Sequence, residues 1–284
     1  MRRKYLFTLF FLLVLSFRPM PSALLGVEHL TKVFQSKQLF RFGGNVQENI
    51  ALNSLSLDFH PSAVHTLIGP SGCGKTTLMN ILCGIETPSS GLLKIAENID
   101  TGNVEYVNCP STSSSRLILS SSASLYQSML IDHKMSNRYN PSLCLGDIES
   151  SLPFSVQRVL SKLYKCARGQ HASSMMESDR RILEIMLALS ALNIDKKYGA
   201  VICIDERWDK DCLSTHRKLS QFLKELIGTI DFDLQFIICT HSRGVLQSYN
   251  ERVIVMNKGQ LYHIGSGDID QRLLPVQLQE NLIQ

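Results

Sequence analysis

Apolar and polar residues alternate in the first part of the chain as they do in β-strands. The alternation covers residues 27–34 and 55–59, and residues 64–68 form a short apolar run. From Thr76 onward apolar residues recur every three or four positions, until Gly84 ends the pattern. This order predicts strands followed by a helix, with a glycine-rich segment between the last strand and the helix.

Residues 129–190 have a mostly helical pattern. Their clearest apolar stripe recurs at steps of three and four residues, as in an amphipathic helix that packs on a core. The stripe consists of Ile182, Ile185, Met186 and Leu189. We therefore predict a helical subdomain over about residues 128–190.

The rest of the chain alternates between strand-like and helical segments. Apolar runs at residues 201–204 and 236–239 predict two buried strands with an amphipathic helix between them. The predicted buried face of that helix consists of Leu219, Phe222, Leu223, Leu226 and Ile227. Such alternation implies a parallel sheet. Residues 252–256 and 260–264 flank a short turn with Gly259 and predict a terminal hairpin.

The charge of the chain is concentrated at its start. The formal net charge is +4, and residues 1–23 hold four basic and no acidic residues, so the remaining chain is neutral. A folded domain that binds nucleic acid usually has a basic surplus, so we expect no nucleic-acid partner. Within the neutral part, residues 108–124 contain eight serines and are predicted to be a flexible insertion.

The eight cysteines include no C-x-x-C pair, so the sequence predicts no metal site of that kind. Cys203 and Cys239 lie in the two strand-like runs, where a thiol behaves as a small apolar side chain. Reduced, structural cysteines and a reducing compartment are therefore expected.

The first 23 residues have the pattern of a targeting segment. Three basic residues precede an apolar stretch over residues 5–17, and the segment ends in Ser22 and Ala23. This favours a signal peptide. An uncleaved membrane anchor is the alternative, although a span needs about 20 apolar residues. The surroundings of Phe17 resemble the cleavage motif of algal complex plastids, which implies a plastid location for the mature protein.

The strongest chemical signal lies between the apolar run at residues 64–68 and the helix that follows it. This segment reads Gly69-Pro70-Ser71-Gly72-Cys73-Gly74-Lys75-Thr76. It fits G-x-x-x-x-G-K-[ST], in which backbone N–H groups and a helix N-terminus bind phosphates. Lys75 is predicted to hold the β- and γ-phosphates and Thr76 to bind Mg²⁺, with Thr77 completing the nucleotide site. A chance glycine turn before a helix is the alternative.

Two later strands end in polar residues suited to hydrolysis. Asp205 and Glu206 follow an apolar run, which predicts Asp205 as a ligand of Mg²⁺ and Glu206 as the general base. Solvated acids at a strand end are the alternative. His241 follows the next run, where an imidazole can contact the γ-phosphate or orient the water. A surface histidine is the alternative there.

With these motifs, the chain from about Leu25 to its end resembles the ATP-binding cassette family. The resemblance implies an α/β fold of the P-loop NTPase type over residues 24–284. That fold has a mostly parallel sheet flanked by helices, an N-terminal antiparallel β portion and a helical subdomain. The resemblance also implies that Phe34 stacks on adenine, and that Gln127 contacts Mg²⁺ and the attacking water. An inward strand residue and a loop amide are the respective alternatives.

Two segments depart from the family pattern. The L-S-G-G-Q signature, which contacts ATP of a partner subunit, is best matched by residues 173–177, where Met175 and Met176 replace the glycines. Residues 166–170 keep the Gly-Gln end but lie farther from Asp205 than the family spacing. After Glu206, the family continues P-x-x-x-L-D. This chain instead reads Arg207-Trp208-Asp209-Lys210-Asp211-Cys212.

These features predict an ATP-binding and ATP-hydrolysing subunit that powers transport through separate transmembrane permease subunits. The chain would then be membrane-associated through its partners. Because the signature acts in trans, its loss favours a heterodimer with a second ATP-binding subunit over a homodimer. Two alternatives are a regulatory subunit with weak or no hydrolysis and a soluble cassette ATPase outside transport. The transported substrate is not specified by the sequence.

Overall fold

The computed structural model describes thirteen segments of the chain. They are residues 25–37, 46–60, 63–96, 104–107, 116–118, 126–131, 143–163, 169–191, 199–205, 211–230, 232–241, 243–249 and 251–266. The predicted targeting segment at residues 1–23 lies outside them, as does most of the serine-rich stretch at residues 108–124.

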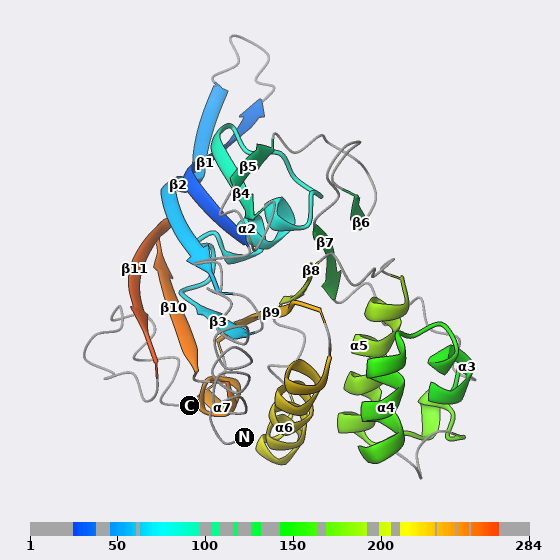
Figure 1. Cartoon of the computed structure of the whole chain (residues 1–284). Helices are drawn as coiled ribbons and strands as arrows, with labels where there is room; N and C mark the ends of the chain where they lie inside the picture. The colour runs from blue at the N-terminus through cyan, green and yellow to red at the C-terminus, as the bar shows by residue number, and fades with distance from the viewer. Residues whose placement is uncertain are drawn as a thin grey trace, which may run out of the picture.

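Four strands form an antiparallel sheet in the order β2-β1-β4-β5 (Figure 1). They are β1 (Leu25–Lys37), β2 (Val46–Phe59), β4 (Ser90–Ala96) and β5 (Val104–Val107). On β2 the residues Leu52, Leu55, Leu57 and Phe59 are buried, and polar residues between them are exposed. This inward and outward alternation is that of a sheet with one solvated face, and it confirms the expected antiparallel portion.

A second sheet has seven strands in the order β11-β10-β3-β9-β8-β7-β6. They are β3 (Val64–Ile68), β6 (Arg116–Ile118), β7 (Tyr126–Ile131), β8 (Gly199–Asp205), β9 (Leu234–Thr240), β10 (Arg252–Asn257) and β11 (Gln260–Gly265). The five central strands, β10 to β7, are parallel, and the edge strands β11 and β6 are antiparallel. The α/β fold with a mostly parallel sheet is thereby confirmed.

Helices cover the parallel sheet. They are α2 (Lys75–Leu82), α3 (Leu145–Glu149), α4 (Phe154–Leu163), α5 (Glu177–Ala191), α6 (Leu213–Thr229) and α7 (Arg243–Ser248), with a 3₁₀ turn at Ala172–Ser174. Helix α2 shares a core with residues of both sheets. Within the described part of the chain, no helix is long and apolar enough to cross a bilayer.

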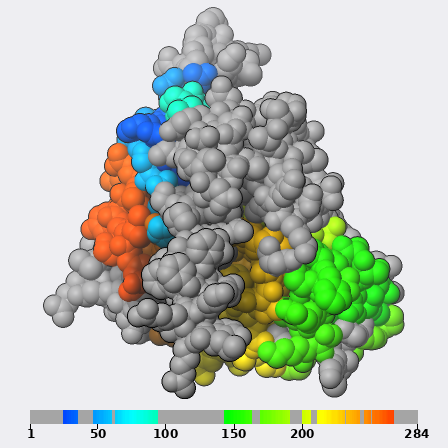
Figure 2. Space-filling view, in the orientation of Figure 1, coloured from blue at the N-terminus to red at the C-terminus, as the bar shows by residue number. Residues whose placement is uncertain are grey.

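Helices α3, α4 and α5 gather at one side of the molecule, away from the antiparallel sheet (Figure 1). Figure 2 shows their residues, in green, across the viewed face from the hairpin β10–β11, in orange. The predicted stripe on α5 is fully buried in the core that these helices share with the parallel sheet. The predicted face of α6 is buried in the same core, with Ile227 at its margin.

One secondary-structure prediction is wrong. Residues 129–131 were expected to begin the helical subdomain, but they complete strand β7, which pairs in parallel with β8. A run of three apolar residues fits a strand and a helix equally well, so main-chain pairing with β8 decides its structure. Residues 116–118 of the serine-rich stretch also form a strand, β6, which pairs with β7.

Candidate functional site

The glycine-rich loop connects β3 to α2 and depends on glycine at two positions. Gly72 and Gly74 have φ angles of 76° and 104°, which favour glycine. A Cβ atom on Gly74 would lie 2.4 Å from the carbonyl oxygen of Ala51 on β2. A Cβ atom on Gly72 would meet nothing within 4 Å, so its side of the loop is open to a ligand.

The turn of the hairpin β10–β11 braces this loop. The N–H of Gly259 donates to the carbonyl oxygen of Cys73 at 2.9 Å, and the N–H of Asn53 donates to the carbonyl oxygen of Gly259 at 2.9 Å. Gly259 has a φ of 75°, and a Cβ there would lie 2.7 Å from the Ala51 carbonyl oxygen. The antiparallel sheet, the loop and the hairpin therefore meet at one point. The sequence pattern predicts a hairpin turn here but carries no signal of its contact with the loop.

The Lys75 side chain is buried against its own loop. Its ammonium donates to the carbonyl oxygens of Gly69 at 3.0 Å and Pro70 at 3.3 Å. The ammonium is also 3.2 Å from Nε2 of His241. Because an ammonium has only donors, Nε2 is the acceptor in this contact. The positive charge of Lys75 is thus held where phosphates would meet the loop.

The carboxyl ends of three parallel strands meet at this loop. Ile68 at the end of β3 pairs with Thr240 at the end of β9, and Cys239 pairs with Asp205 at the end of β8. This order brings His241 and Asp205 to the loop. The Thr76 hydroxyl donates to Oδ1 of Asp205 at 3.3 Å. Ligands of open α/β sheets bind at this edge.

The remaining loop residues differ in exposure. Ser71 and Gly72 are exposed, Thr77 is half-buried, and Gly69, Pro70 and Cys73 are buried. The predicted base Glu206 lies outside the described residues, directly after Asp205. The chain thus offers hydroxyl and carboxylate oxygens, which Mg²⁺ prefers, next to a cationic glycine loop suited to phosphates. The residues present fit a magnesium nucleotide.

Phe34 lies on β1 and presents its ring to solvent, with 39% of the residue exposed. The Lys32 ammonium lies 4.9 Å from the centre of this ring. Lys32 is held by Glu86 at 2.5 Å and by the carbonyl oxygen of Thr87 at 2.7 Å. One face of an aromatic ring is therefore supported by a cation while part of the ring remains accessible for stacking.

The backbone of Gln127 has a defined register in the parallel sheet. It lies on β7 and pairs with Ala200, at the amino end of β8, whereas Asp205 is at the carboxyl end. Five residues of a parallel strand span roughly 16 Å. The backbone of Gln127 therefore lies at the opposite end of strand β8 from Asp205, and its contact with Mg²⁺ stays a prediction.

The segment that resembles the family signature turns its two methionines in different directions. Met175 is 5% exposed and packs in the core of the helices, whereas Met176 is 63% exposed. Of the two methionines that replace signature glycines, only Met176 lies at the surface. The Ser174 hydroxyl donates to the carbonyl oxygen of His171 at 2.9 Å. Of the alternative match at residues 166–170, only exposed Gly169 and Gln170 are among the described residues.

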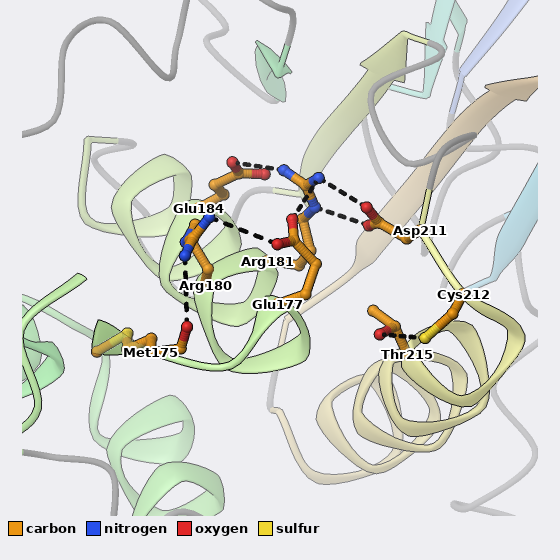
Figure 3. Close-up of polar contacts among 8 residues, drawn as sticks. All are labelled: Met175, Glu177, Arg180, Arg181, Glu184, Asp211, Cys212 and Thr215. Atoms are coloured by element: carbon orange, nitrogen blue, oxygen red, sulfur yellow. Dashed lines mark hydrogen bonds and ion pairs between the residues drawn. The ribbon is translucent and has the colours of Figure 1, made fainter. Parts of the chain in front are cut away.

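A buried cluster of charges follows this segment (Figure 3). Arg181 on α5 contacts Asp211 through Nε and Nη2, both at 2.8 Å, and contacts Glu177 at 2.7 Å and Glu184 at 3.0 Å. Arg180 also contacts Glu177 at 3.4 Å. This cluster has no signal in the sequence, because its central pair joins residues 30 positions apart.

The described cysteines are free thiols. A hydrogen bond with Cys83, burial and neighbouring negative groups raise the pKa of Cys203 well above its ordinary value, so this thiol is neutral in the core. Cys212, the N-cap of α6, is exposed, and hydrogen bonds from Ser214 and Thr215 lower its pKa from 9.0 to about 7. The interpretation of Cys203 and Cys239 as reduced and buried is confirmed.

Comparison with known proteins gives the family. The sequence profile described as "ABC transporter" matches residues 52–206, more than half of the 284-residue chain. The chain belongs to the ABC transporter family. The match includes the glycine loop and both acids of the β8 strand end, so this family member retains the segments that resemble a nucleotide site.

Relatives of this ABC family member include import proteins. The sulfate/thiosulfate import ATP-binding protein CysA of Pseudomonas putida is 28% identical over 218 residues, which cover 76% of this chain and 62% of the relative. The spermidine/putrescine import ATP-binding protein PotA of Bacillus anthracis is 24% identical over 242 residues, covering 84% of this chain and 67% of the relative. The chain thus spans about two thirds of the length of these relatives.

Solved structures share the fold of this ABC family member. A nucleotide-free ATP-binding cassette from an ABC transporter superposes with a TM-score of 0.59 at 17% identity, over 86% of this chain and 92% of the cassette. A dimeric bacterial ABC transporter cassette, MJ0796, superposes with a TM-score of 0.53 at 16% identity, over 87% of this chain and all of that one. These similarities establish the P-loop NTPase fold of the ABC cassette.

Proposed function

We propose that this ABC family member binds ATP with Mg²⁺, hydrolyses it, and thereby drives transport through separate transmembrane permease subunits. The observation that carries the proposal is the convergence of Lys75, His241 and the Thr76–Asp205 pair at the carboxyl edge of the sheet. The relatives named above, which are import ATP-binding proteins, support the role in transport.

In the proposed mechanism, each residue has a distinct task. Loop N–H groups and the Lys75 ammonium bind the β- and γ-phosphates and offset their charge. Thr76 and Asp205 hold Mg²⁺, which neutralises charge that develops during phosphoryl transfer. Glu206 accepts a proton from the attacking water, and His241 orients the γ-phosphate or that water. Phe34 stacks on the adenine ring.

Nucleotide binding and hydrolysis are tested separately. Lys75→Ala is expected to abolish binding of a fluorescent ATP analogue, whereas Lys218→Ala, on the exposed face of α6, keeps the parental Kd. Glu206→Gln is expected to retain ATP binding and lower steady-state kcat at least about 100-fold. A near-parental rate in Glu206→Gln would remove that residue from the hydrolytic step. Parental binding in Lys75→Ala would refute the nucleotide site itself.

The proposed assembly is a heterodimer with a second ATP-binding subunit. The motivating observation is the exposed side chain of Met176 at a position where the family signature has glycine. A methionine covers the backbone N–H groups that a γ-phosphate of the partner subunit would need. Co-purification from the native cell is expected to recover a different cassette chain and permease subunits. Recovery of this chain alone as a hydrolytic homodimer would contradict the proposal.

The second candidate function is a regulatory subunit with weak or no hydrolysis. The same replacement of signature glycines favours it, because a homodimer would lack a good signature at both sites. Measuring kcat of the purified chain alone and after addition of co-purified cassette subunits separates the two functions. Hydrolysis only in the mixture supports the heterodimer, and tight ATP binding without hydrolysis in either supports the regulatory role.

For the first 23 residues we propose a cleaved targeting segment, with a plastid as its destination. The support is the basic, apolar and small-residue order of the sequence. Amino-terminal sequencing is expected to show that the mature protein begins after residue 23, and microscopy of a tagged full chain tests the destination. A mature chain that keeps Met1 would rule out cleavage.

A further inference from the structure

The buried charge cluster around Arg181 joins two helices that are separate in the sequence (Figure 3). The Arg181 side chain is 8% exposed, and the Asp211 side chain is 4% exposed. Two guanidinium nitrogens contact the two oxygens of the same carboxylate, each at 2.8 Å. A bidentate pair of this kind fixes orientation as well as distance.

Each residue of the Arg181–Asp211 pair is close in sequence to a segment that the proposed function uses. Arg181 lies one turn into α5, four positions after the last residue of the segment that resembles the family signature. Asp211 precedes Cys212, the N-cap of α6, and stands six positions after Asp205. The chain between them, residues 206–210, therefore starts at the Thr76–Asp205 contact and ends at the pair with Arg181.

Among the described residues, the cluster has three acids and two bases. Arg180 and Arg181 face Glu177, Glu184 and Asp211, and the Glu184 side chain is fully buried. Arg181 contacts all three carboxylates. Lysine would keep the charge, but an ammonium lacks the planar fork that contacts both oxygens of Asp211 while reaching the two glutamates. The geometry thus depends on arginine and not on charge alone.

We propose that Arg181 is a positioning residue for ATP hydrolysis. Through Asp211 it fixes the start of α6, and with it the downstream end of the segment that follows Asp205, relative to α5. This inference rests on the proposed function and deepens it, because it makes hydrolysis depend on the contact between the helical side of the molecule and the strand that ends in Asp205.

Intrinsic tryptophan fluorescence can be used to test this proposal. Trp208 is the one tryptophan in the sequence and lies between Asp205 and Asp211. Its fluorescence, and its quenching by acrylamide, can be followed in the whole protein without a label. This measurement does not require hydrolysis. It therefore tests whether the Arg181–Asp211 pair fixes this segment even if the chain does not hydrolyse ATP.

Two mild variants test the proposal in the full chain. Asp211→Asn keeps the size of the side chain and leaves Arg181 its contacts with Glu177 and Glu184, so it is expected to fold. Arg181→Lys keeps the positive charge and loses the bidentate geometry. In both variants we expect kcat at least about fivefold lower with an unchanged Kd for the fluorescent ATP analogue. The acrylamide quenching constant of Trp208 is expected to rise about twofold.

Glu251→Gln is the matched control. It removes the exposed ion pair between Lys224 of α6 and Glu251, whose nitrogen and oxygen are 3.0 Å apart. Because exposed pairs contribute little, parental kcat and parental Trp208 quenching are expected. A purely structural role of Arg181 would lower the melting temperature and leave kcat of the folded enzyme unchanged.

The outcomes separate the two proposals. Parental kcat and quenching in both variants would overturn the inference and leave ATP hydrolysis standing. If the parental chain, alone and with its partners, binds ATP but does not hydrolyse it, the hydrolytic part of both proposals fails. The quenching comparison then still decides whether Arg181 fixes this segment.

Discussion

The glycine loop and the start of α5 are fixed by different kinds of interaction. The loop is fixed through its backbone, by glycines at positive φ and by main-chain hydrogen bonds to the turn at Gly259. The start of α5 is fixed through side chains, by buried Met175 and by the ion pairs of Arg181. Backbone N–H groups at glycine positions can contact phosphates, because no side chain covers them. A segment that is stabilised by its side chains can be stable without exposing its backbone N–H groups.

Under the proposed function, this difference would explain how one chain keeps its own nucleotide site while losing its contribution to the site of a partner. The sequence requirements of the loop are strict, because Gly69 and Gly74 leave no room for a Cβ atom and Gly72 has a positive φ. The requirements at residues 173–177 concern the stability of the helices. Substitutions in the two regions are therefore expected to have different consequences.

The largest expected effect is that of Gly74→Ala. Its φ of 104° and its approach of 2.4 Å to the Ala51 carbonyl oxygen are both incompatible with a Cβ atom. We expect a loss of at least about 3 kcal/mol in unfolding free energy and no measurable ATP binding. Gly228→Ala, where a Cβ meets nothing within 4 Å, is the control and should stabilise α6 slightly. Denaturant titration and analogue binding measure both.

The two methionines provide the next comparison. Met175→Ala is expected to lower the unfolding free energy by about 2–5 kcal/mol, because it leaves a cavity in the core of the helices. Met176→Ala should change it by less than about 0.5 kcal/mol, because that side chain is exposed. Urea titration of both variants is the measurement. Equal effects would mean that the two side chains do not point in opposite directions.

Low pH is expected to reduce the unfolding free energy through a histidine on β3, the strand that precedes the glycine loop. His65 on β3 is buried, and burial lowers its pKa from 6.5 to about 4. The neutral ring is favoured in the folded state, so its contribution is fully present above pH 6.5 and is lost as the pH falls toward 4. Once this contribution is completely lost, the unfolding free energy is lower by roughly 3 kcal/mol. Urea titrations at pH 7, 5.5 and 4 should show a smaller acid loss in His65→Gln.

The smallest expected effect is on the reactivity of an exposed cysteine and not on the unfolding free energy. The Cys212 pKa of about 7 predicts alkylation by iodoacetamide with a midpoint near pH 7. Burial and Asp147 raise the pKa of Cys144 above 9.0, so this thiol is the internal control. Peptide mapping by mass spectrometry across pH 6–10 measures both. Ser214→Ala should move the Cys212 midpoint upward, because it removes the largest stabilising hydrogen bond.

The features that sequence reasoning predicted are those specified by local pattern. Strand β3, the buried face of α6 and the hairpin β10–β11 each follow from periodicity or turn residues within a few positions. The glycine loop was likewise recognisable, because its chemistry needs particular residues at fixed spacing. Main-chain geometry then brings Asp205 and His241 to it through the order of parallel strands.

The features that were missed depend on contacts between distant positions. Nothing local distinguishes residues 129–131 as a strand, since pairing with β8 decides it. The pair of Arg181 with Asp211 and the bond from Gly259 to Cys73 likewise join separate parts of the chain. Charged residues on a helix usually face solvent, so burial of Arg181 had no sequence signal.

The brace at Gly259 also sets an order of events during synthesis. A ribosome releases the glycine loop long before it reaches the hairpin, and the neighbours of β3 in its sheet, β9 and β10, are translated later as well. A nascent chain that stops short of residue 259 lacks the main-chain donor that holds Cys73. If the proposed function holds, nucleotide in the surrounding medium would therefore stabilise the loop only after residue 259 has been synthesised.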